Sequence, residues 1–336
     1  MFFPEMVTSG MLTDVTGIYE RIGSRLLGGM RDLCTYNGRQ YAFPYALNTL
    51  IWIYRQDIFD EAGIDASTVK NIDDFIAAGH KLRETFPDAY IHTGNVNDHA
   101  DYFNWCVPGT GMNSLIDANG NYNFADKPEI KAVMEDVKKL YDSGLVYDVP
   151  AWTPDWEQGF GSDKVVSYLI CNWFKDAAFL PNYAPHTSGK WGATVWPAIG
   201  GGLGGAEFGG ALIMVLDNSP NRDAAIDMLT KLTFTNEGGL AGYASSGNSM
   251  IPVLTEAYSD PSVMAGDEFF GDVFWQAEMD SMDLFKMWDY TPAASMEFDI
   301  IKSYMVRYLS GELSLDDALN RAQRDCTTQI GNPLDM

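Results

Sequence analysis

The chain has 336 residues, which is long enough for two domains of ordinary size. Hydrophobic residues make up 46% and charged residues 20%, so the composition is that of a globular protein and excludes wholesale disorder. Lys and Arg total 22 against 46 Asp and Glu, and the resulting net charge of −24 repels polyanions and argues against nucleic-acid binding.

Features that would insert the chain into a membrane or export it are missing from the sequence. No run of about 18 apolar residues occurs, which excludes a transmembrane helix. The first residues, MFFPEM, have neither the basic start nor the apolar core of a secretory signal. We therefore expect either a cytosolic protein or one whose export signal is absent from this chain.

The cysteine pattern argues against a structural metal. The sequence has no C-x-x-C motif and no histidine at metal-ligand spacing, and its four cysteines lie far apart: Cys34, Cys106, Cys171 and Cys326. Buried, unused thiols are the favoured interpretation. A single disulfide stays open, because sequence spacing does not report proximity in space.

In chain order, the first clear elements are extended segments followed by two helices. Residues 40–59 are rich in aromatic and β-branched residues, and Pro44 predicts two extended pieces that meet at a bend. Residues 57–63 predict a short helix that ends at a glycine. Asn71, with acidic residues after it, predicts the capped start of a longer helix.

Residues 113–143 predict a hairpin turn and then a helix. Asn119-Gly120 is a hairpin signal, and Pro128 lies in the first turn of a helix whose apolar residues form one stripe: Ile130, Val133, Val137 and Leu140. The spacing Asp117-x-Asn119-x-Asn121 partly resembles a calcium loop. The glycine is one position early and the final Glu is missing, so a turn is favoured over a metal site.

Two strands and a glycine-rich loop follow. Residues 165–170 and 192–196 read as strands, and residues 200–205 contain G-x-G-x-x-G, the dinucleotide-binding fingerprint. That fingerprint requires a helix at its end, whereas residues 207–216 read as strand. We therefore predict a flexible connector and no bound cofactor.

The rest of the chain is mostly helical. Residues 223–234 form an amphipathic pattern, another piece begins at 236, and the last two helices are predicted over 295–309 and 315–330. Ser314 is followed by two acidic residues, which is typical of a helix start. Strands mixed with many helices predict the α/β class.

Several segments, in their order and spacing, resemble the family 1 extracellular solute-binding proteins. These are the sugar receptors of ABC importers and include the maltose-binding protein. The segments are YNGRQYAFP (36–44), IYRQDIFDEAGID (53–65), IDDF (72–75), TNEGG (235–239) and SGELSLDDAL (310–319). The resemblance extends over nearly the whole chain, but Met1 aligns inside the family pattern. We therefore expect a truncated form that lacks the signal peptide and the opening units of the first lobe.

The resemblance implies a two-lobed fold of the periplasmic-binding-protein type (type II) with a hinged cleft between the lobes. The N-terminal lobe, incomplete here, is expected to comprise residues 1–48 and 209–258, and the C-terminal lobe residues 49–208 and 259–336. The connectors are expected near 47–49 and 208–211, where Gly209 and Gly210 suit a segment whose backbone angles change. Hinge closure around the ligand would follow.

A sugar-binding site needs flat aromatic side chains for the C–H faces of the sugar and carboxylates or amides for its hydroxyls. Most tryptophans are expected in the core, Trp52, Trp191 and Trp196 among them. Trp173 follows a strand at a strand-to-helix turn, and the resemblance implies that it stacks on sugar. The other candidate ligand contacts are Tyr102, Asp101, Asn48, Asn172, Asp155, Trp156, Trp288 and Phe298.

The expected function is capture of a saccharide and its delivery to ABC permease subunits, outside the cytoplasm, by a monomer. A lipid anchor is the one membrane attachment considered, and it would precede this chain. One alternative is a secreted glycan hydrolase, but sequence spacing cannot identify the two carboxylates that hydrolysis needs, and neither G-x-S-x-G nor H-E-x-x-H occurs. We therefore expect that the protein is not an enzyme. A surface module without a small ligand is the second alternative, and a two-lobed cleft argues against it.

Overall fold

The protein is described from a computed structural model, which covers residues 3–22, 25–27, 29–175, 179–204, 207–240, 252–266, 268–284, 286 and 288–336. The first half contains α1 (Phe3–Thr8), α2 (Thr16–Ile22), α3 (Met30–Leu33), β1 (Thr35–Tyr36), β2 (Arg39–Gln40), β3 (Phe43–Arg55), α4 (Gln56–Glu61), α5 (Ile72–Thr85), β4 (His92–Thr93), α6 (Val96–Ala100), α7 (Tyr102–Cys106), α8 (Pro128–Asp142), β5 (Val146–Tyr147) and α9 (Pro154–Gly161). The second half contains β6 (Ser167–Cys171), the 3₁₀ turn η4 (Asn172–Lys175), α10 (Leu180–Tyr183), β7 (Trp191–Val195), β8 (Glu207–Ile213), α11 (Arg222–Phe234), the π-helical turn η6 (Asn236–Leu240), α13 (Val273–Asp283), α14 (Ala294–Leu309) and α15 (Leu315–Gln329).

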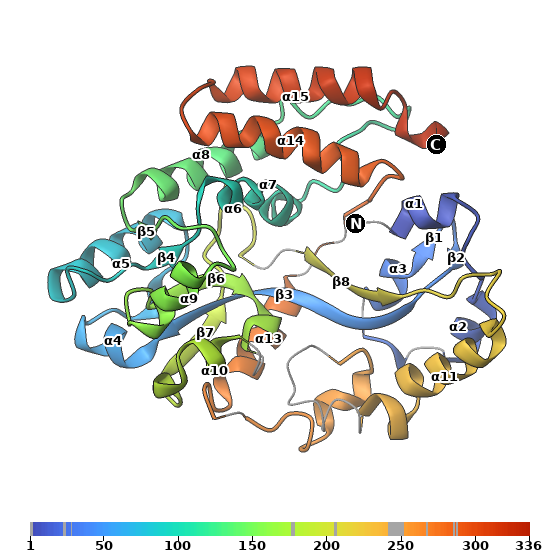
Figure 1. Cartoon of the computed structure of the whole chain (residues 1–336), viewed down its shortest axis with the longest axis horizontal. Helices are drawn as coiled ribbons and strands as arrows, with labels where there is room; N and C mark the ends of the chain where they lie inside the picture. The colour runs from blue at the N-terminus through green and yellow to red at the C-terminus, as the bar shows by residue number, and fades with distance from the viewer. Residues whose placement is uncertain are drawn as a thin grey trace.

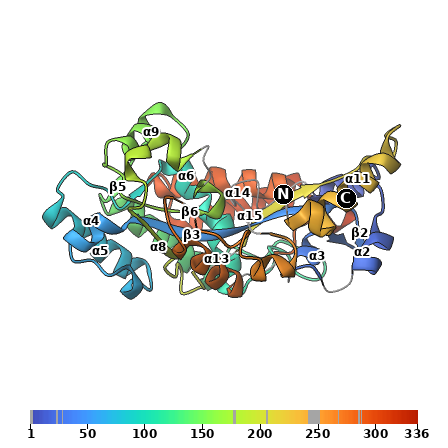
Figure 2. The ribbon, with the colours of Figure 1, turned by 90° about the horizontal axis from the view of Figure 1, so that it is seen from below.

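One long strand, β3, runs through both halves of the molecule (Figure 1). Its first part, Phe43 to Thr49, pairs antiparallel with β8. Its second part lies between β6 and β7, with Leu50 opposite Cys171 and Arg55 opposite Trp191. Figure 2 shows the same division from below, with α4 and α5 at one end of β3 and α2 and α11 at the other. The strand therefore connects two differently built halves.

The buried apolar residues also divide along β3. One hydrophobic cluster is formed by selected buried residues, the first group lying between Val15 and Leu47 and the second including Val215, Leu229, Leu254 and Val263. It includes Phe43 and Leu47 from the first part of β3. Two further clusters take the opposite faces of the second part: Leu50 and Trp52 pack in one, Ile51 and Ile53 in the other. This follows from the alternation of side chains along a strand covered on both faces by helices. In Figure 1, α14 and α15 lie together above α7 and α8.

The expected bend at Pro44 is wrong, because β3 is continuous from Phe43 to Arg55 and includes Pro44. Proline has no N–H to give to a ladder. Here Pro44 lies next to a shift in register between β3 and β8, where the ladder is already irregular. A second shift separates Leu47 from Thr49.

Most local predictions are confirmed. The Asn71 side chain accepts a hydrogen bond from the Asp74 N–H at 3.0 Å, and the Ser314 hydroxyl accepts one from the Asp317 N–H at 3.1 Å. The predicted stripe of α8 is buried. The strand expected after the glycine-rich loop is β8, although Gly205 itself lies outside the described residues. All four cysteines are buried and free, and Trp52, Trp191 and Trp196 are buried as predicted.

The Asp117 turn is also confirmed. Its carboxylate accepts hydrogen bonds from the backbone N–H groups of Asn119 at 2.8 Å and Asn121 at 2.9 Å, which closes the turn on itself. Among the described helices, none combines the length and the hydropathy that crossing a membrane requires.

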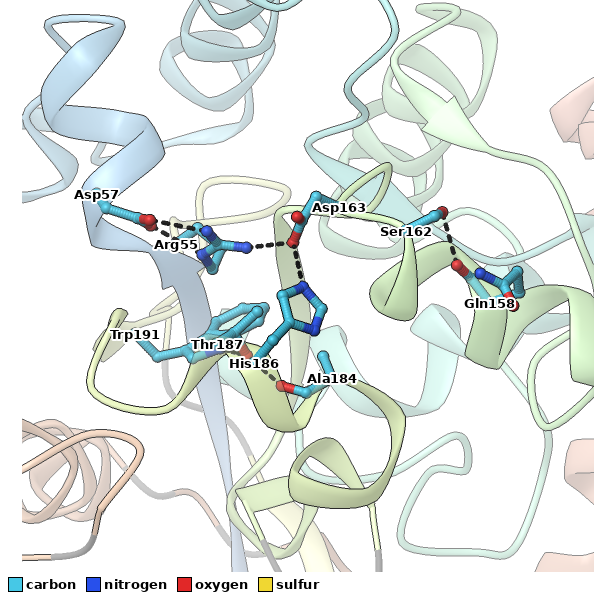
Figure 3. A network of polar contacts seen from close by, with 9 residues as sticks. All are labelled: Arg55, Asp57, Gln158, Ser162, Asp163, Ala184, His186, Thr187 and Trp191. Atoms are coloured by element: carbon cyan, nitrogen blue, oxygen red, sulfur yellow. Dashed lines mark hydrogen bonds and ion pairs between the residues drawn. The ribbon is translucent and has the colours of Figure 1, made fainter.

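A buried arginine ties several segments together at the far end of β3 (Figure 3). The Arg55 guanidinium donates to both carboxylate oxygens of Asp57, at 2.8 and 2.7 Å, and also to Asp163, in the loop after α9. His186 contacts the same Asp163 oxygen at 3.1 Å. The side chain of Arg55 is almost fully buried, while both aspartates are about half exposed.

We expect Arg55→Met to lower the free energy of unfolding by about 2–4 kcal/mol, because it leaves two partly buried carboxylates without their planar, bidentate donor. Arg55→Lys is expected to recover only part of the loss, since an ammonium does not match the fork geometry. Arg39→Met removes a surface pair with Asp14 and is the matched control, with an expected loss under about 1 kcal/mol. Urea unfolding of the three variants checks this, and equal midpoints for Arg55→Met and Arg39→Met would contradict it.

Candidate functional site

Aromatic side chains gather at the turn that follows β6. Trp173, on η4, is half-buried, and its ring lies 5.5 Å from the ring of Trp152 with an angle of 32° between the planes. Phe179 contacts both rings, at 5.3 Å from Trp173 and 5.6 Å from Trp152. We call these three side chains the aromatic patch. Apolar ring faces that gather and stay accessible to solvent favour a binding role.

Trp152 and Phe179 are the members of the patch that sequence reasoning missed, and Trp152 is the more exposed of the two. Its side chain is 48% exposed, and its φ of +67° lies in a region that bulky side chains rarely adopt. A hydrogen bond of 2.7 Å from the Thr153 hydroxyl to the Pro150 carbonyl closes the turn around it. A strained backbone that presents an exposed indole is typical of a functional position. The available signal was the pair of prolines that flank Trp152 just before a helix.

Trp156 was expected to be the exposed platform of this segment, and its position shows why that expectation is wrong. Pro154 begins α9, so Trp156 lies in the first helical turn rather than on a loop. Its side chain is 0% exposed and packs against Phe160 one turn later, at 5.0 Å, with Trp152 above it at 4.8 Å. Trp156 is therefore a buried packing partner of Trp152 and does not face solvent. Asp155, beside it, is exposed at the start of α9.

Tyr102 is buried, and its hydroxyl is hydrogen-bonded to His92 and to the backbone of Leu169. Its hydroxyl lies 2.7 Å from Nε2 of His92 and 3.5 Å from the carbonyl of Leu169, and the Leu169 N–H lies 3.4 Å from Nδ1 of His92. Because Nδ1 accepts from that N–H, Nε2 carries the proton and donates to Tyr102, which in turn donates to Leu169. Burial raises the pKa of Tyr102 and lowers the pKa of His92, so both groups are held neutral.

Asp101, next to Tyr102, forms a half-buried ion pair across the fold. Lys302 of α14 approaches its carboxylate at 2.7 Å, and the two side chains are 36% and 29% exposed. Burial raises the pKa of Asp101, and the hydrogen bond from Lys302 opposes that rise. The pair links α7 to α14, which also carries Phe298.

The remaining candidates are held within the fold. Trp288 and Phe298 are buried in the same hydrophobic cluster as Tyr102, whereas Trp156 and Trp173 pack in the other cluster of this half. Asn172 is fully buried, and Asn48 is half-buried on β3 between the two residues that flank its second register shift. The structure therefore places Trp156 and Trp173 each against Trp152, with Asp155 and Asn172 as their neighbours in sequence. It packs Tyr102, Phe298 and Trp288 in one large hydrophobic cluster, with Asp101 next to Tyr102 in sequence. Ligand contact by these residues stays a prediction.

Comparison with known proteins agrees with this architecture. The model of the family described as bacterial extracellular solute-binding protein matches residues 2–271. A binding protein of an ABC transporter from B. animalis subsp. lactis, solved with β-1,6-galactobiose, superposes with a TM-score of 0.80 at 21% identity and covers 98% of this chain and 84% of its own. The lacto-N-biose-binding protein of Bifidobacterium longum gives a TM-score of 0.79 at 20% identity, with 99% and 80% covered.

The curated relatives are longer than this chain. An arabinooligosaccharide-binding protein of Halalkalibacterium halodurans is 24% identical over 281 residues, which is 80% of this chain. A lactose-binding protein of Rhizobium radiobacter is 23% identical over 73% of this chain. This chain spans 61% and 57% of the lengths of those two relatives. The structures share the two-lobed fold of periplasmic binding proteins, and the family model matches most of the sequence, so this chain belongs to the bacterial extracellular solute-binding protein family.

Proposed function

We propose that this protein is a saccharide receptor that works outside the cytoplasm and passes its ligand to the permease subunits of an ABC importer. The aromatic patch carries the proposal: Trp152 and Trp173 offer indole faces to solvent at the turn after β6. Such faces match the C–H surface of a sugar ring. The relatives named above for arabino-oligosaccharides and lactose, and the neighbours solved with galactobiose and lacto-N-biose, support a neutral mono- or oligosaccharide.

In this proposal the two lobes are residues 1–48 with 209–258 and residues 49–208 with 259–336. The separate hydrophobic clusters on the two parts of β3 support the division, except that Val263 packs in the cluster of the first lobe. The aromatic patch lies on the second lobe. Trp173 and Trp152 contact the sugar, Asn48 and Asp155 supply hydrogen bonds, and the lobes close over it. The receptor acts as a monomer without catalysis, as a free protein or on a lipid anchor.

A thermal-shift screen with arabino-oligosaccharides, galactobiose, lactose, chitobiose and maltose tests the proposal. At a concentration about 100-fold above its dissociation constant, the correct ligand adds about 2.7 kcal/mol to folding stability. For a chain of this length that corresponds to a rise of about 4 °C in the unfolding midpoint. Chromatography of the sugars after incubation gives the second readout. Stabilisation with intact sugar supports a receptor, release of shortened sugars would indicate a hydrolase, and no shift with any sugar would contradict the proposal.

A further inference from the structure

The strand β3 changes partners at one point. Up to Thr49 it pairs with β8, and from Leu50 it pairs with β6. The register shift between Leu47 and Thr49 lies directly before the change. Because regular pairing holds the strand firmly on each side, backbone rotation between the two halves is easiest in this short irregular stretch.

The side chain of Asn172 reaches this same point from the aromatic patch. β6 ends at Cys171, opposite Leu50, and Asn172 is the next residue. Its amide nitrogen donates to the carbonyl of Leu47 at 3.1 Å, and its amide oxygen accepts from the N–H of Trp173 at 3.0 Å. The side chain therefore continues the ladder by one bond after the backbone of β6 has left the sheet. Asn172 is 0% exposed, and a hydrogen bond enclosed in this way is costly to break.

A second bond holds the other side of the junction. The hydroxyl of Ser281, on α13, donates to the carbonyl of Leu50 at 3.1 Å. Between the two bonds lies Thr49, which is 1% exposed and whose hydroxyl oxygen has no hydrogen-bond partner within the described part of the chain. A buried hydroxyl without a partner favours any rearrangement that gives it one. Hydrogen bonds from Asn172 and Ser281 thus hold the two ends of the junction. Between them, the hydroxyl of Thr49 lacks a hydrogen-bond partner among the described residues.

We infer that Asn172 is a positioning residue that couples the aromatic patch to the junction of the two halves. Its amide oxygen is bonded to the backbone of Trp173, and its amide nitrogen is bonded to Leu47 on β3, the strand whose backbone would rotate when the two halves move. Displacement of Trp173 is therefore transmitted to Leu47, and rotation at Leu47 displaces Trp173. This inference rests on the proposed function for its consequence in ligand binding, but the coupling itself is a property of the free protein.

Asn172→Asp separates the two bonds of the amide once its carboxyl is ionised, because a carboxylate still accepts from the N–H of Trp173 but cannot donate to Leu47. Burial raises the pKa of a carboxyl at this position, so the measurements are made at alkaline pH, where the protonated acid that could donate to Leu47 is not the main form. Ser281→Ala is the matched control, since it removes a bond of the same length to the same strand without touching the patch. Hydrogen–deuterium exchange of the free proteins is the first measurement. We expect Asn172→Asp to raise exchange about tenfold in both segments 46–50 and 172–175, and Ser281→Ala to leave 172–175 unchanged.

Calorimetric titration with the saccharide found for the wild type, together with small-angle X-ray scattering, gives the second measurement. Asn172→Asp is expected to bind about tenfold more weakly and to show a smaller change in radius of gyration at saturation, while Ser281→Ala binds as the wild type does. Exchange confined to one of the two segments would overturn the coupling. Weaker binding with the full change in radius would identify Asn172 as a direct ligand contact instead. If no sugar binds the wild type but both segments respond, the proposed function fails and the coupling stands.

Discussion

Trp173→Ala is expected to raise the dissociation constant for the bound saccharide by about ten- to one-hundred-fold, which corresponds to roughly 1.4–2.7 kcal/mol. The half-buried indole supplies one flat face of the aromatic patch, and alanine removes both its apolar area and its stacking contribution. Trp173→Phe retains a smaller flat ring and is expected to lose less. Calorimetric titration of each variant gives the comparison.

Trp152→Ala extends this test to a patch residue that sequence reasoning missed. The Trp152 and Trp173 rings are in contact, so the double variant is expected to lose less affinity than the two single losses added together. Met228→Ala is the control, because Met228 is 54% exposed and lies on α11, in the other half. A titration curve for Trp173→Ala that matches the wild type, in a protein that still unfolds cooperatively, would remove the patch from the site.

The second large effect is a loss of stability in acid, and it comes from two buried histidines. His92 and His99 are fully buried with their rings 5.3 Å apart, and burial lowers the pKa of each below the usual 6.5. The unfolded chain therefore binds protons at these positions below pH 6.5 that the folded chain does not. The free energy of unfolding is therefore not reduced by these histidines above about pH 6.5, and it falls as the pH decreases below that value. Each histidine contributes up to about 1.4 kcal/mol per pH unit, or about 2.7 for both.

The groups around the histidines do not cancel this effect. Tyr102 and Tyr168 contact His92 as neutral phenols, and Asp98 and Asp148 act on His99 in the direction that raises its pKa, but burial outweighs them. Asp101 and Glu297 have pKa values raised by burial and so act with the opposite sign at mildly acidic pH. A comparison of variants at the histidines isolates the histidine contribution from these carboxyl groups.

Urea unfolding of the wild type and of His92→Gln/His99→Phe between pH 8 and pH 5 provides the measurement. The double variant is expected to be less stable at pH 8, because its polar contacts and packing are altered, but to lose less stability on acidification. His80→Gln, at an exposed position, should keep the pH dependence of the wild type. Parallel curves for the wild type and the double variant would contradict the assignment.

Much of this protein follows from its sequence, because the determining interactions are local. The caps at Asn71 and Ser314 bind backbone groups three residues away, and the stripe of α8 depends only on helical spacing. The strand after the glycine-rich loop was likewise predictable from its own residues. The order of such motifs, together with the hairpin and connector patterns, was sufficient for the fold class and the family.

The tertiary structure decided what depends on contacts between distant segments. Sequence alone could not tell that Trp152 rather than Trp156 keeps its indole in solvent, because exposure depends on which residues pack against α9. The partner of Asn172 lies 125 residues away, and the partner of Asp101 lies 201 residues away. Such contacts form only when several elements are packed together, and the free energy that selects them comes from burial over the whole core rather than from any local pattern.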